Sequence, residues 1–556
     1  MSALVRRVPA WAITASFALV YVIVAPASTD LAAAGYRSDL FARAGFTLWD
    51  NGWYGGHHMV AYSLLSPGLG ALIGPQLLAA LSMTVATALF ALLIDGGAFP
   101  ARAARIASLW FAYGAAIGLL ANRVPFDLGL AIGLGALLAA RASTRMPRRS
   151  SRARLRALTV VLAILCALAS PIAGAFLALA AIAWALAGTH PDRRFASALA
   201  FTALLPIVVL VLSFPEGGPQ PFVASAFYPT LGAVLLIAAL IPPGGSEFGQ
   251  PVLRTGAVLY AAALIGAYLL PTAVGGNVDR LGALMAGPLA AACAFAVASS
   301  GGFSRLVGTG GSWRVRLLIV FAPLLIYWQS NAPIGDYASA ASDPAVNASY
   351  YRPLIDELSV LGVGYGPRPA RIEVVPTRDH GEARWVAPHV MIARGWERQL
   401  DVDRNALFYR SPLKGDRYED WLSYAAISYV ALPDAPLDYS ARAEGRLVRA
   451  LPSYLREVWH SQHWRLYAVR QAIPLAPPPS VVTAVGTDSF SLRAPRAGTF
   501  RVRVRFTPYW ALAGGHGCVR RAPGGWTNVQ TRGAGSVRVV IDFSLARVFE
   551  HGPRCR

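Results

Sequence analysis

Charge is scarce in this chain. Of its 556 residues, 14% are charged and 55% are hydrophobic, and the mean hydropathy is +0.46. Soluble globular domains carry about 25% charged residues, so the composition excludes an ordinary soluble protein, and it is far too apolar for a disordered one. Lysine is almost absent, since Lys414 is the single one, and arginine supplies nearly all of the net charge of +21.

Several families of motif are missing as well. The four cysteines form no CxxC pair and no zinc spacing with histidine, and neither a P-loop nor a dinucleotide-binding glycine fingerprint is present. Cys166 and Cys293 lie within apolar runs. Cys518 and Cys555 lie near the C-terminus, where an oxidising exterior would permit a disulfide between them.

What the chain has in quantity is apolar runs of nearly membrane-spanning length, which requires about 17–25 residues. One block is interrupted at Ser170-Pro171, and because proline ends or kinks a helix it predicts a tight helical hairpin. The runs predict a polytopic α-helical membrane protein of about eleven transmembrane helices, at 10–27, 74–93, 104–121, 125–141, 157–170, 171–187, 196–213, 228–241, 254–270, 281–299 and 316–329.

Arginine placement predicts the orientation. The gap 141–156 holds seven arginines and no acid, so by the positive-inside rule it faces the cytoplasm. Eleven crossings then give a cytoplasmic N-terminus and an extracytoplasmic C-terminus in the plasma membrane. A basic pI can indicate nucleic acid, but arginines placed between apolar runs indicate membrane topology instead, and no nucleic-acid partner is expected.

The composition divides the chain into three predicted domains. Residues 1–330 form the transmembrane domain. Strand-like runs such as 426–432 and 464–469 place a mixed α/β module at 335–472, and runs such as 499–506 and 536–543 place a small β-sandwich at 480–550, after a proline-rich linker.

Three loops on the predicted outer side carry polar residues, and we expect them to line one external cavity. The candidate site residues are Asp39, Asp50, His57 and His58 in the first loop, Arg123 and Asp127 in a second, and Asn277, Asp279 and Arg280 in a third.

Each candidate has a functional and a structural interpretation. Asp39 could act as a general base or form a helix cap or a salt bridge with Arg37 or Arg43. Arg123 and Arg280 could bind a phosphate through guanidinium forks or snorkel at helix ends.

The remaining candidates in these loops are weaker. Asp50 also fits a turn sequence, and His57 and His58 could bind a metal or a phosphate or be polar residues at the membrane interface. The two glycines before Asn277 could admit a ligand to the backbone or make a turn. The apolar segment 58–73 predicts an interfacial or re-entrant helix broken at Pro67-Gly68.

Together, a first span, an external loop with an acid about a dozen positions later, an interfacial helix, many further spans and an external C-terminal region resemble the GT-C superfamily. These are integral-membrane glycosyltransferases that use polyprenyl-phosphate sugars. The resemblance covers the N-terminal 330 residues and rests on Asp39, which stands at the position of the family's acid.

The resemblance implies that Asp39 is the catalytic base, that external arginines hold the donor phosphate, and that transfer inverts the sugar outside the cell. A cell-wall glycan or glycolipid would be the acceptor, with membrane lipid around the protein. Many members show paired acids in this loop, whereas Asp39 stands alone between Asp30 and Asp50. A divalent cation is the cofactor that the resemblance allows.

The C-terminal region resembles that of large bacterial membrane proteins of this group, around RIEVVPTRDHGEARWVAP and ARGWERQLD. The charged residues of these stretches are expected at the surface or at strand edges, with acceptor binding as the alternative. In the sandwich, Tyr509, Trp510 and Trp526 could stack on a glycan or belong to the core. Abundant arginine and alanine are typical of GC-rich bacteria such as actinobacteria.

Two other functions fit the same pattern. A transporter or flippase would need charged or broken segments near the midplane, often in paired repeats, and a non-catalytic envelope assembly protein would need the external region alone. A blind cavity open to the outside would favour the transferase, and a path open on two sides would favour transport.

Overall fold

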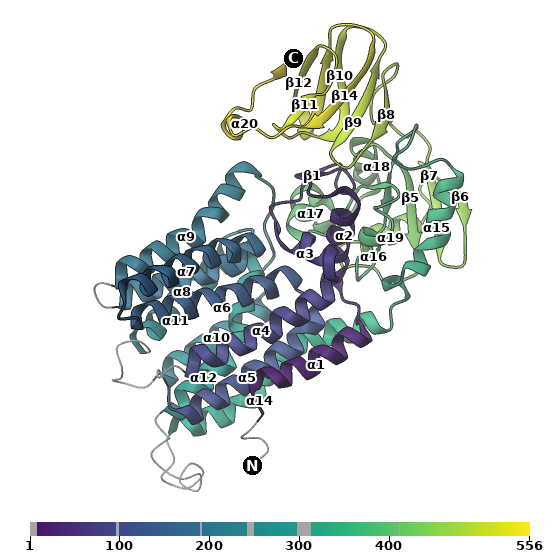
Figure 1. The fold of residues 1–556 in the computed structure, drawn as a ribbon. Coiled ribbons are helices and arrows are strands. Elements are labelled where there is room, and N and C mark those ends of the chain that lie inside the picture. Colours follow the sequence, from purple (N-terminus) through teal and green to yellow (C-terminus); the bar gives the residue numbers. More distant parts are fainter. Residues whose placement is uncertain are drawn as a thin grey trace. The chain divides into compact units, whose positions relative to one another are not determined.

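The computed structural model describes residues 8–95, 99–188, 192–241, 250–296, 313–410 and 412–555. The chain divides into two compact units (Figure 1). The helical unit comprises Met1–Leu31, Tyr62–Val209 and Pro219–Ala341, and the mixed unit comprises Ala32–Ala61, Leu210–Gly218 and Ser342–Arg556.

In the helical unit, every predicted apolar run coincides with a helix, although the end of the run 281–299 lies outside the described residues. The helices are α1 (Ala10–Val24), α3 (Ser66–Ile73), α4 (Pro75–Asp95), α5 (Ala101–Gly118), η1 (Leu119–Ala121), α6 (Val124–Arg145), α7 (Arg149–Ala169), α8 (Pro171–Ala187), α9 (Asp192–Ser213), α10 (Ala224–Leu240), α11 (Gln250–Leu269), η2 (Gly275–Val278), α12 (Asp279–Ala296) and α14 (Trp313–Ala341).

Seven helices of the described chain are long and apolar enough to cross a membrane. They contain α4, α5, α6, α9, α11, α12 and α14. α1 and the following helix α2 (Thr29–Ala44) form a pair bent by 74°, and α8 and α10 are apolar but shorter. The protein is therefore a multi-pass helical membrane protein, and the count of eleven crossings stays a prediction.

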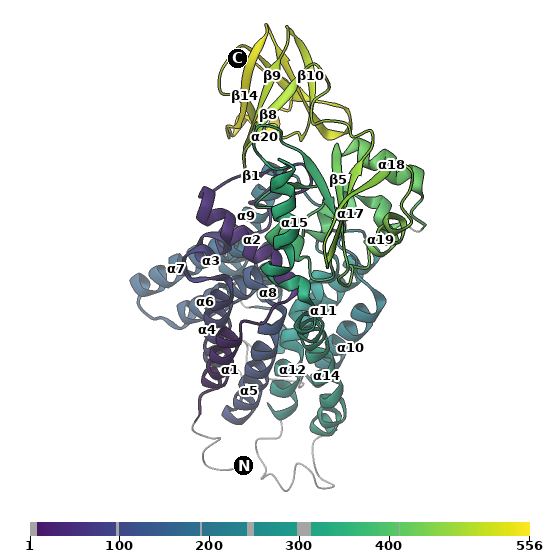
Figure 2. The ribbon, with the colours of Figure 1, turned by 90° about the vertical axis from the view of Figure 1, so that its right-hand side faces the viewer.

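Small residues bring these helices close together. α6 lies against α4 and α7, and α5 lies against α12, as the two views of Figures 1 and 2 show. At Gly129 in α6, an added Cβ would lie 2.7 Å from the Cβ of Ala173. Close approach of backbones at glycine and alanine is how helices pack where burial from water gives no driving force.

The break between α7 and α8 confirms the predicted hairpin. Ser170 caps α8 by accepting a hydrogen bond from the backbone nitrogen of Ala173 at 3.4 Å, and Pro171 occupies the first turn. The prediction for 58–73 is wrong over its first half, because the helix α3 begins only at Ser66. Pro67 starts that helix rather than breaking one, since proline fits the first helical turn.

The mixed unit contains a five-stranded sheet with the order β4-β3-β5-β7-β6, in which β3, β4 and β5 are parallel and β7 and β6 run antiparallel. Its strands are β3 (Arg371–Val374), β4 (Met391–Ile392), β5 (Ile427–Pro433), β6 (Leu455–His460) and β7 (Trp464–Val469). The helices of this region are η4 (Pro344–Val346), α15 (Ala348–Val360), α16 (Gly381–Trp385), α17 (Arg398–Arg404), η5 (Ala406–Tyr409), α18 (Gly415–Tyr424) and α19 (Arg442–Arg449).

Helices cover both faces of this sheet (Figure 2). One apolar cluster joins α15 and α16 to Ile372 and Leu466, and the other joins α18 and α19 to Ile427 and Tyr467. The first cluster also contains Ala33, Tyr36 and Leu40 from one stripe of α2. The loop that follows the first span thus contributes its helix to the core of the mixed unit.

Two four-stranded sheets form a sandwich at the C-terminal end, with orders β10-β13-β12-β15 and β11-β14-β9-β8. The elements are β8 (Val481–Val485), β9 (Ser489–Ala494), β10 (Gly498–Arg505), β11 (Trp510–Leu512), β12 (Gly517–Arg521), η6 (Pro523–Gly525), β13 (Trp526–Thr531), β14 (Gly535–Ile541), α20 (Ala546–Phe549) and β15 (Arg554–Cys555). The predicted strand runs coincide with β5, β7, β10 and β14. Tyr509, Trp510 and Trp526 are buried, so the stacking role considered for them is wrong.

A short hairpin connects these parts of the mixed unit. β1 (Trp49–Asp50) pairs with β2 (His57–His58). Between them, the Gly52 carbonyl accepts a hydrogen bond from the Ile392 nitrogen, and Asn51 Nδ2 donates to the Gly486 carbonyl at 2.9 Å. The hairpin therefore contacts both the five-stranded sheet and the sandwich.

Cys518 and Cys555 form a disulfide that joins β12 to β15 and closes a chain segment of 37 residues. We predict that Cys518→Ser lowers the free energy of unfolding of the mixed unit by about 2–4 kcal/mol, because the unfolded chain gains the entropy of an open loop. Thermal unfolding of the purified protein measures the change. Cys555→Ser and the double variant should match Cys518→Ser, and an undiminished melting temperature would contradict the prediction.

Candidate functional site

The starts of α2, α6 and α12 bring five charged residues together: Asp30, Arg123, Asp127, Asp279 and Arg280. We call this group the Arg123–Arg280 cluster. Asn122, in the left-handed conformation with φ 53°, ends η1, and Arg123 then precedes α6. Asp279 and Arg280 occupy the first turn of α12. Two helix starts that are distant in the sequence therefore meet at one place.

Within the cluster, Arg123 Nε lies 3.9 Å from Asp30 Oδ2, and each side chain is 29% exposed. Asp279 and Asp127 also act electrostatically on Arg123. The guanidinium of Arg280 lies over the ring of Phe126, 5.6 Å from its centroid. Asp127 is 3% exposed, and its Oδ2 has no hydrogen-bond partner among the described residues.

Neighbouring hydrogen bonds hold the loops around the cluster. Tyr21 donates to Asn122 Oδ1, and Asn122 Nδ2 donates to the Pro26 carbonyl at 3.4 Å. Ser28 donates to the Ala121 carbonyl at 3.3 Å. The end of α1, the start of α2 and the α5–α6 connection are thereby fixed around Arg123.

The glycines before Asn277 serve packing. Gly275 has φ +40°, and an added Cβ would lie 1.8 Å from the Gln220 carbonyl oxygen. At Gly276 the Pro221 carbonyl oxygen would lie 2.9 Å away. The pair makes a tight turn against neighbouring backbone, which is the second of the two interpretations given by the sequence. Asn277 is half-buried within this turn.

Asp39 lies in α2, in the part that belongs to the mixed unit. Its side chain is 43% exposed, and Arg384 Nε lies 3.3 Å from its Oδ2. Arg384 crosses the helix at Gly35, where an added Cβ would lie 2.5 Å from the guanidinium carbon. The salt bridge of the structural interpretation is formed with Arg384, and Arg37 pairs with Glu397 at 2.8 Å.

The other first-loop candidates are buried in the mixed unit. Asp50 accepts hydrogen bonds from the Tyr36 hydroxyl at 2.8 Å and the Gly52 nitrogen at 3.0 Å. Burial raises the pKa of Asp50 to about 6, against the opposing effect of these two donors. His57 is 0% exposed and stacks on Trp53, and burial lowers its pKa to about 3. His57 is therefore neutral near pH 7.

His58 participates in an ion-pair group that was not evident from the sequence. Its Nδ1 lies 2.9 Å from Glu216 Oε1, and its Nε2 lies 3.0 Å from the Thr507 hydroxyl. Arg404 Nη2 lies 3.2 Å from the same Glu216 oxygen. Burial alone would raise the pKa of Glu216, but His58 and Arg404 bring it down to about 2.

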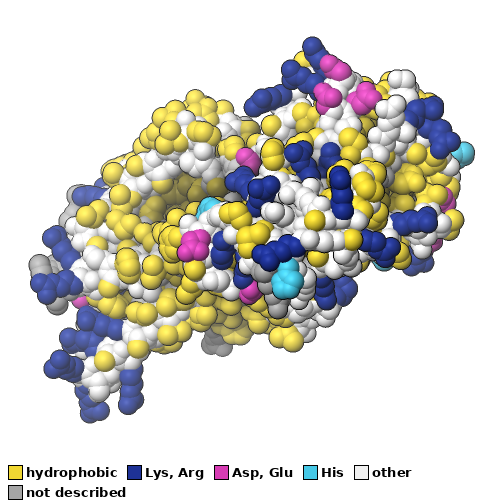
Figure 3. All heavy atoms as spheres, turned by 90° about the horizontal axis from the view of Figure 1, so that it is seen from above, with side chains coloured by type: hydrophobic (Ala, Val, Ile, Leu, Met, Phe, Trp, Pro, Cys, Tyr) yellow, Lys and Arg dark blue, Asp and Glu magenta, His cyan; other side chains and the backbone are white. Residues whose placement is uncertain are grey.

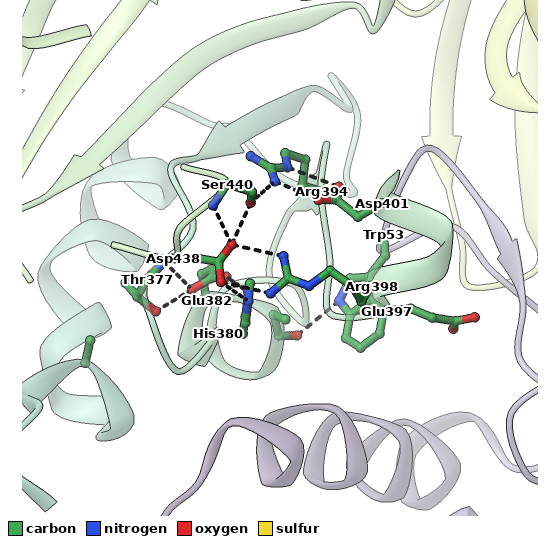
Figure 4. A network of polar contacts seen from close by, with 12 residues as sticks. Trp53, Thr377, His380, Glu382, Arg394, Glu397, Arg398, Asp401, Asp438 and Ser440 are labelled. Atoms are coloured by element: carbon green, nitrogen blue, oxygen red, sulfur yellow. Dashed lines mark hydrogen bonds and ion pairs between the residues drawn. The ribbon is translucent and has the colours of Figure 1, made fainter. Parts of the chain in front are cut away.

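The charged residues around 373–401, expected at the surface, are largely buried instead. Figure 4 shows their network. Arg394 forms two hydrogen bonds to Asp401, at 2.6 and 3.1 Å, and also contacts Glu444 and Ser440. Arg398 forms two to Asp438, at 2.8 and 3.0 Å.

His380 joins the same network. Its Nδ1 lies 3.1 Å from Glu382 Oε1, and its Nε2 lies 3.6 Å from Asp438 Oδ2. Burial lowers the pKa of His380, but these two carboxylates outweigh it and the net shift is upward. The partners come from loops near 380, 398 and 438, so the network fixes three loops of the mixed unit. Its arginines and carboxylates largely meet one another's hydrogen-bonding and charge requirements.

Several of these residues were not singled out as candidates by the sequence. Asp30 is one, although an acid just after the first span is a readable signal. Glu216, Arg404 and Asp438 are others, and no local pattern marks them, because their partners are distant in the sequence. No group of three or more His, Cys, Asp or Glu side chains that could hold a metal ion occurs among the described residues. The carboxylates of the Arg123–Arg280 cluster face arginines, so we derive no step through a divalent cation.

The comparisons with known proteins find similar solved structures but no matching family model and no curated relative. The chain is similar to a mutant of the arabinofuranosyltransferase AftD from Mycobacteria, with 14% identity and a TM-score of 0.48, over 96% of this chain and 60% of that one.

Two other solved structures are similar to this chain. The oligosaccharyltransferase of Archaeoglobus fulgidus has 16% identity and a TM-score of 0.42, over 76% of this chain and 68% of that one. ArnT from Cupriavidus metallidurans has 13% identity and a TM-score of 0.40, over 82% and 98%. AftD and the oligosaccharyltransferase are named for the transfer of sugars.

The low pKa of Glu216 gives a prediction about stability. A carboxyl with a pKa near 2 when folded and about 4.5 when unfolded stabilises the fold above pH 4.5, by about 3 kcal/mol, and this contribution is lost as the pH falls toward 2. We therefore expect Glu216→Gln to lower the melting temperature clearly at pH 7 and much less at pH 3. The exposed Asp420→Asn is the control. If Glu216→Gln lowered the melting temperature equally at pH 7 and at pH 3, the low pKa of Glu216 would be contradicted.

Proposed function

We propose that this protein is a membrane glycosyltransferase that moves a sugar from a polyprenyl-phosphate donor to a cell-wall glycan or glycolipid outside the plasma membrane. The observation that carries the proposal is the Arg123–Arg280 cluster. Ionisable groups are costly within a membrane protein's helical region and usually mark a functional site. In the proposed topology this cluster and the mixed unit lie on the extracytoplasmic side.

The two arginines suit a phosphate. A guanidinium stays charged at any ordinary pH and can form paired hydrogen bonds to phosphate oxygens. Arg280 is the better candidate, because it is half-buried over Phe126 and has no carboxylate within ion-pair distance among the described residues. Arg123 already contacts Asp30. In this proposal Asp127, Asp279 and Asn277 hold the two arginines and the turn that carries Arg280.

Asp39 is proposed as the general base. Its side chain is open to solvent, unlike that of Asp50, which is 2% exposed. Asp39 would accept the proton of an acceptor hydroxyl as the hydroxyl oxygen attacks the anomeric carbon. The bond from that carbon to the phosphate oxygen breaks, and the polyprenyl phosphate leaves with its charge balanced by arginine. Asp50, His57 and His58 are proposed to support the fold of the mixed unit.

The base assignment predicts that Asp39→Asn lowers transfer by about 10²–10⁴-fold, the usual contribution of a general base, without changing expression. The transfer activity is measured by lipid and glycan profiling of a deletion strain that is complemented with the wild type or with Asp39→Asn. The exposed Asp420→Asn is the matched control. Asp30→Asn separates the two acids of α2: it should weaken donor use, and if it abolished transfer while Asp39→Asn did not, the base would be Asp30.

The phosphate assignment predicts that Arg280→Gln raises the KM for the donor by about 10- to 100-fold, since a charge-assisted hydrogen bond is lost. Arg280→Lys should restore part of the affinity. Proteoliposomes with labelled polyprenyl-phosphate pentose or hexose as probes give the values, and the exposed Arg194→Gln is the control. An unchanged KM in Arg280→Gln would remove Arg280 from the donor site.

A further inference from the structure

An apolar cavity of about 260 Å³ lies among the helices of the helical unit. Its walls come from α4, α6, α8, α11 and α12, and include Phe90, Leu137, Trp184, Val252 and Leu289. Arg141, in the last part of α6, is the one charged residue that lines it among the described residues. The volume is slightly below the roughly 300–1,000 Å³ of typical ligand pockets, and the almost wholly apolar walls suit part of a hydrocarbon chain.

Arg141 is poorly satisfied where it lies. Its side chain is 8% exposed, and Nη1 donates to the Leu93 carbonyl. Nη2 is buried and has no hydrogen-bond partner among the described residues, and no ion pair between described residues includes Arg141. The buried Arg394, by contrast, contacts two carboxylates. A buried guanidinium that faces one carbonyl leaves a charge and a donor for an anion.

The two features together define the chemistry of an occupant. An apolar wall attracts a hydrocarbon chain, and the free guanidinium donor attracts an anionic oxygen at the end of that chain. A free phosphate ion would leave the walls unfilled, and a neutral lipid would leave the charge unpaired. Arg141 also adjoins the arginine-rich segment 141–156, and basic pockets between membrane helices are known to take anionic headgroups.

We propose that this cavity binds one acyl chain of an anionic glycerophospholipid, with its phosphate on Arg141. This site is separate from the Arg123–Arg280 cluster and does not depend on the proposed transfer reaction. By the predicted topology it draws its lipid from the cytoplasmic leaflet. Seen from above in Figure 3, hydrophobic side chains cover large areas and basic side chains lie in separate groups among them.

Lipid binding to the full-length protein in detergent tests the proposal. Dioleoyl-phosphatidylglycerol, dioleoyl-phosphatidylcholine and inorganic phosphate are titrated separately, with bound lipid counted by native mass spectrometry and the melting temperature followed in parallel. We expect phosphatidylglycerol to bind and raise the melting temperature, and the other two probes to do neither. Arg141→Gln should weaken binding at least about tenfold, while Arg141→Lys retains most of it.

Two further variants make the outcome decisive. Arg145→Gln removes the same charge one turn along α6, at an exposed position, and should bind phosphatidylglycerol as the wild type does. Leu137→Trp fills the cavity while leaving Arg141 in place, so it should also lose binding, even if Arg141→Gln fails to fold. Equal binding of phosphatidylcholine, a shift with inorganic phosphate alone, or undiminished binding in Leu137→Trp would overturn the proposal.

Discussion

A guanidinium group taken out of water keeps its charge, and much of this structure depends on where each buried arginine finds its acceptors. Arg394 and Arg398 find carboxylates from loops that are distant in the sequence, and these pairs fix the loops of the mixed unit. Arg371, which is 1% exposed, donates instead to the carbonyls of Ala425 and Arg503. Most arginines of the described residues are exposed, but these few buried ones act as structural cross-links.

The same constraint separates the functional proposals from the structural pairs. Arginines such as Arg394 and Arg398 hold the fold through carboxylates. An arginine in no ion pair between described residues that also has donors left over can bind an external anion. Arg280 and Arg141 belong to the second group. Their surroundings differ, because Arg280 lies among acids and near other polar loops, whereas Arg141 lies among hydrocarbon side chains. The chemistry of the neighbours is therefore what distinguishes a donor phosphate from a lipid phosphate in these proposals.

Much of the helical unit could be predicted from the sequence, because a run of apolar residues needs no partner to be recognised. The break at Ser170-Pro171 is equally local, since it follows from the geometry of proline. Strands such as 464–469 were also predictable from alternation. The apolar runs do not predict how many helices cross the membrane. Helices such as α7, α8 and α10 are short or carry arginines, so they are less clearly membrane-spanning than the seven long apolar helices.

The mixed unit was less predictable, for a physical reason. The chain between Ala32 and Ala61 reads as a polar loop with scattered aromatics, yet Tyr36 stacks on Trp53 and both enter a core built by residues beyond 345. His57 and Asp50 are buried by the same packing. Charged residues such as Arg394 look like surface residues until the carboxylates that meet them are known. A local sequence pattern shows only whether a residue is polar. Whether such a residue is buried in the mixed unit depends on partners hundreds of positions away.

The strand order of the sandwich gives the disulfide at its end a second consequence. β12 would be the last strand of its sheet without β15, which covers part of its edge and is covalently attached there. An open edge strand can pair with the edge of another molecule, and a short, fixed covering strand opposes this. The bond near the C-terminus therefore also holds a short strand over part of the β12 edge, which opposes pairing of that edge with another copy of the chain.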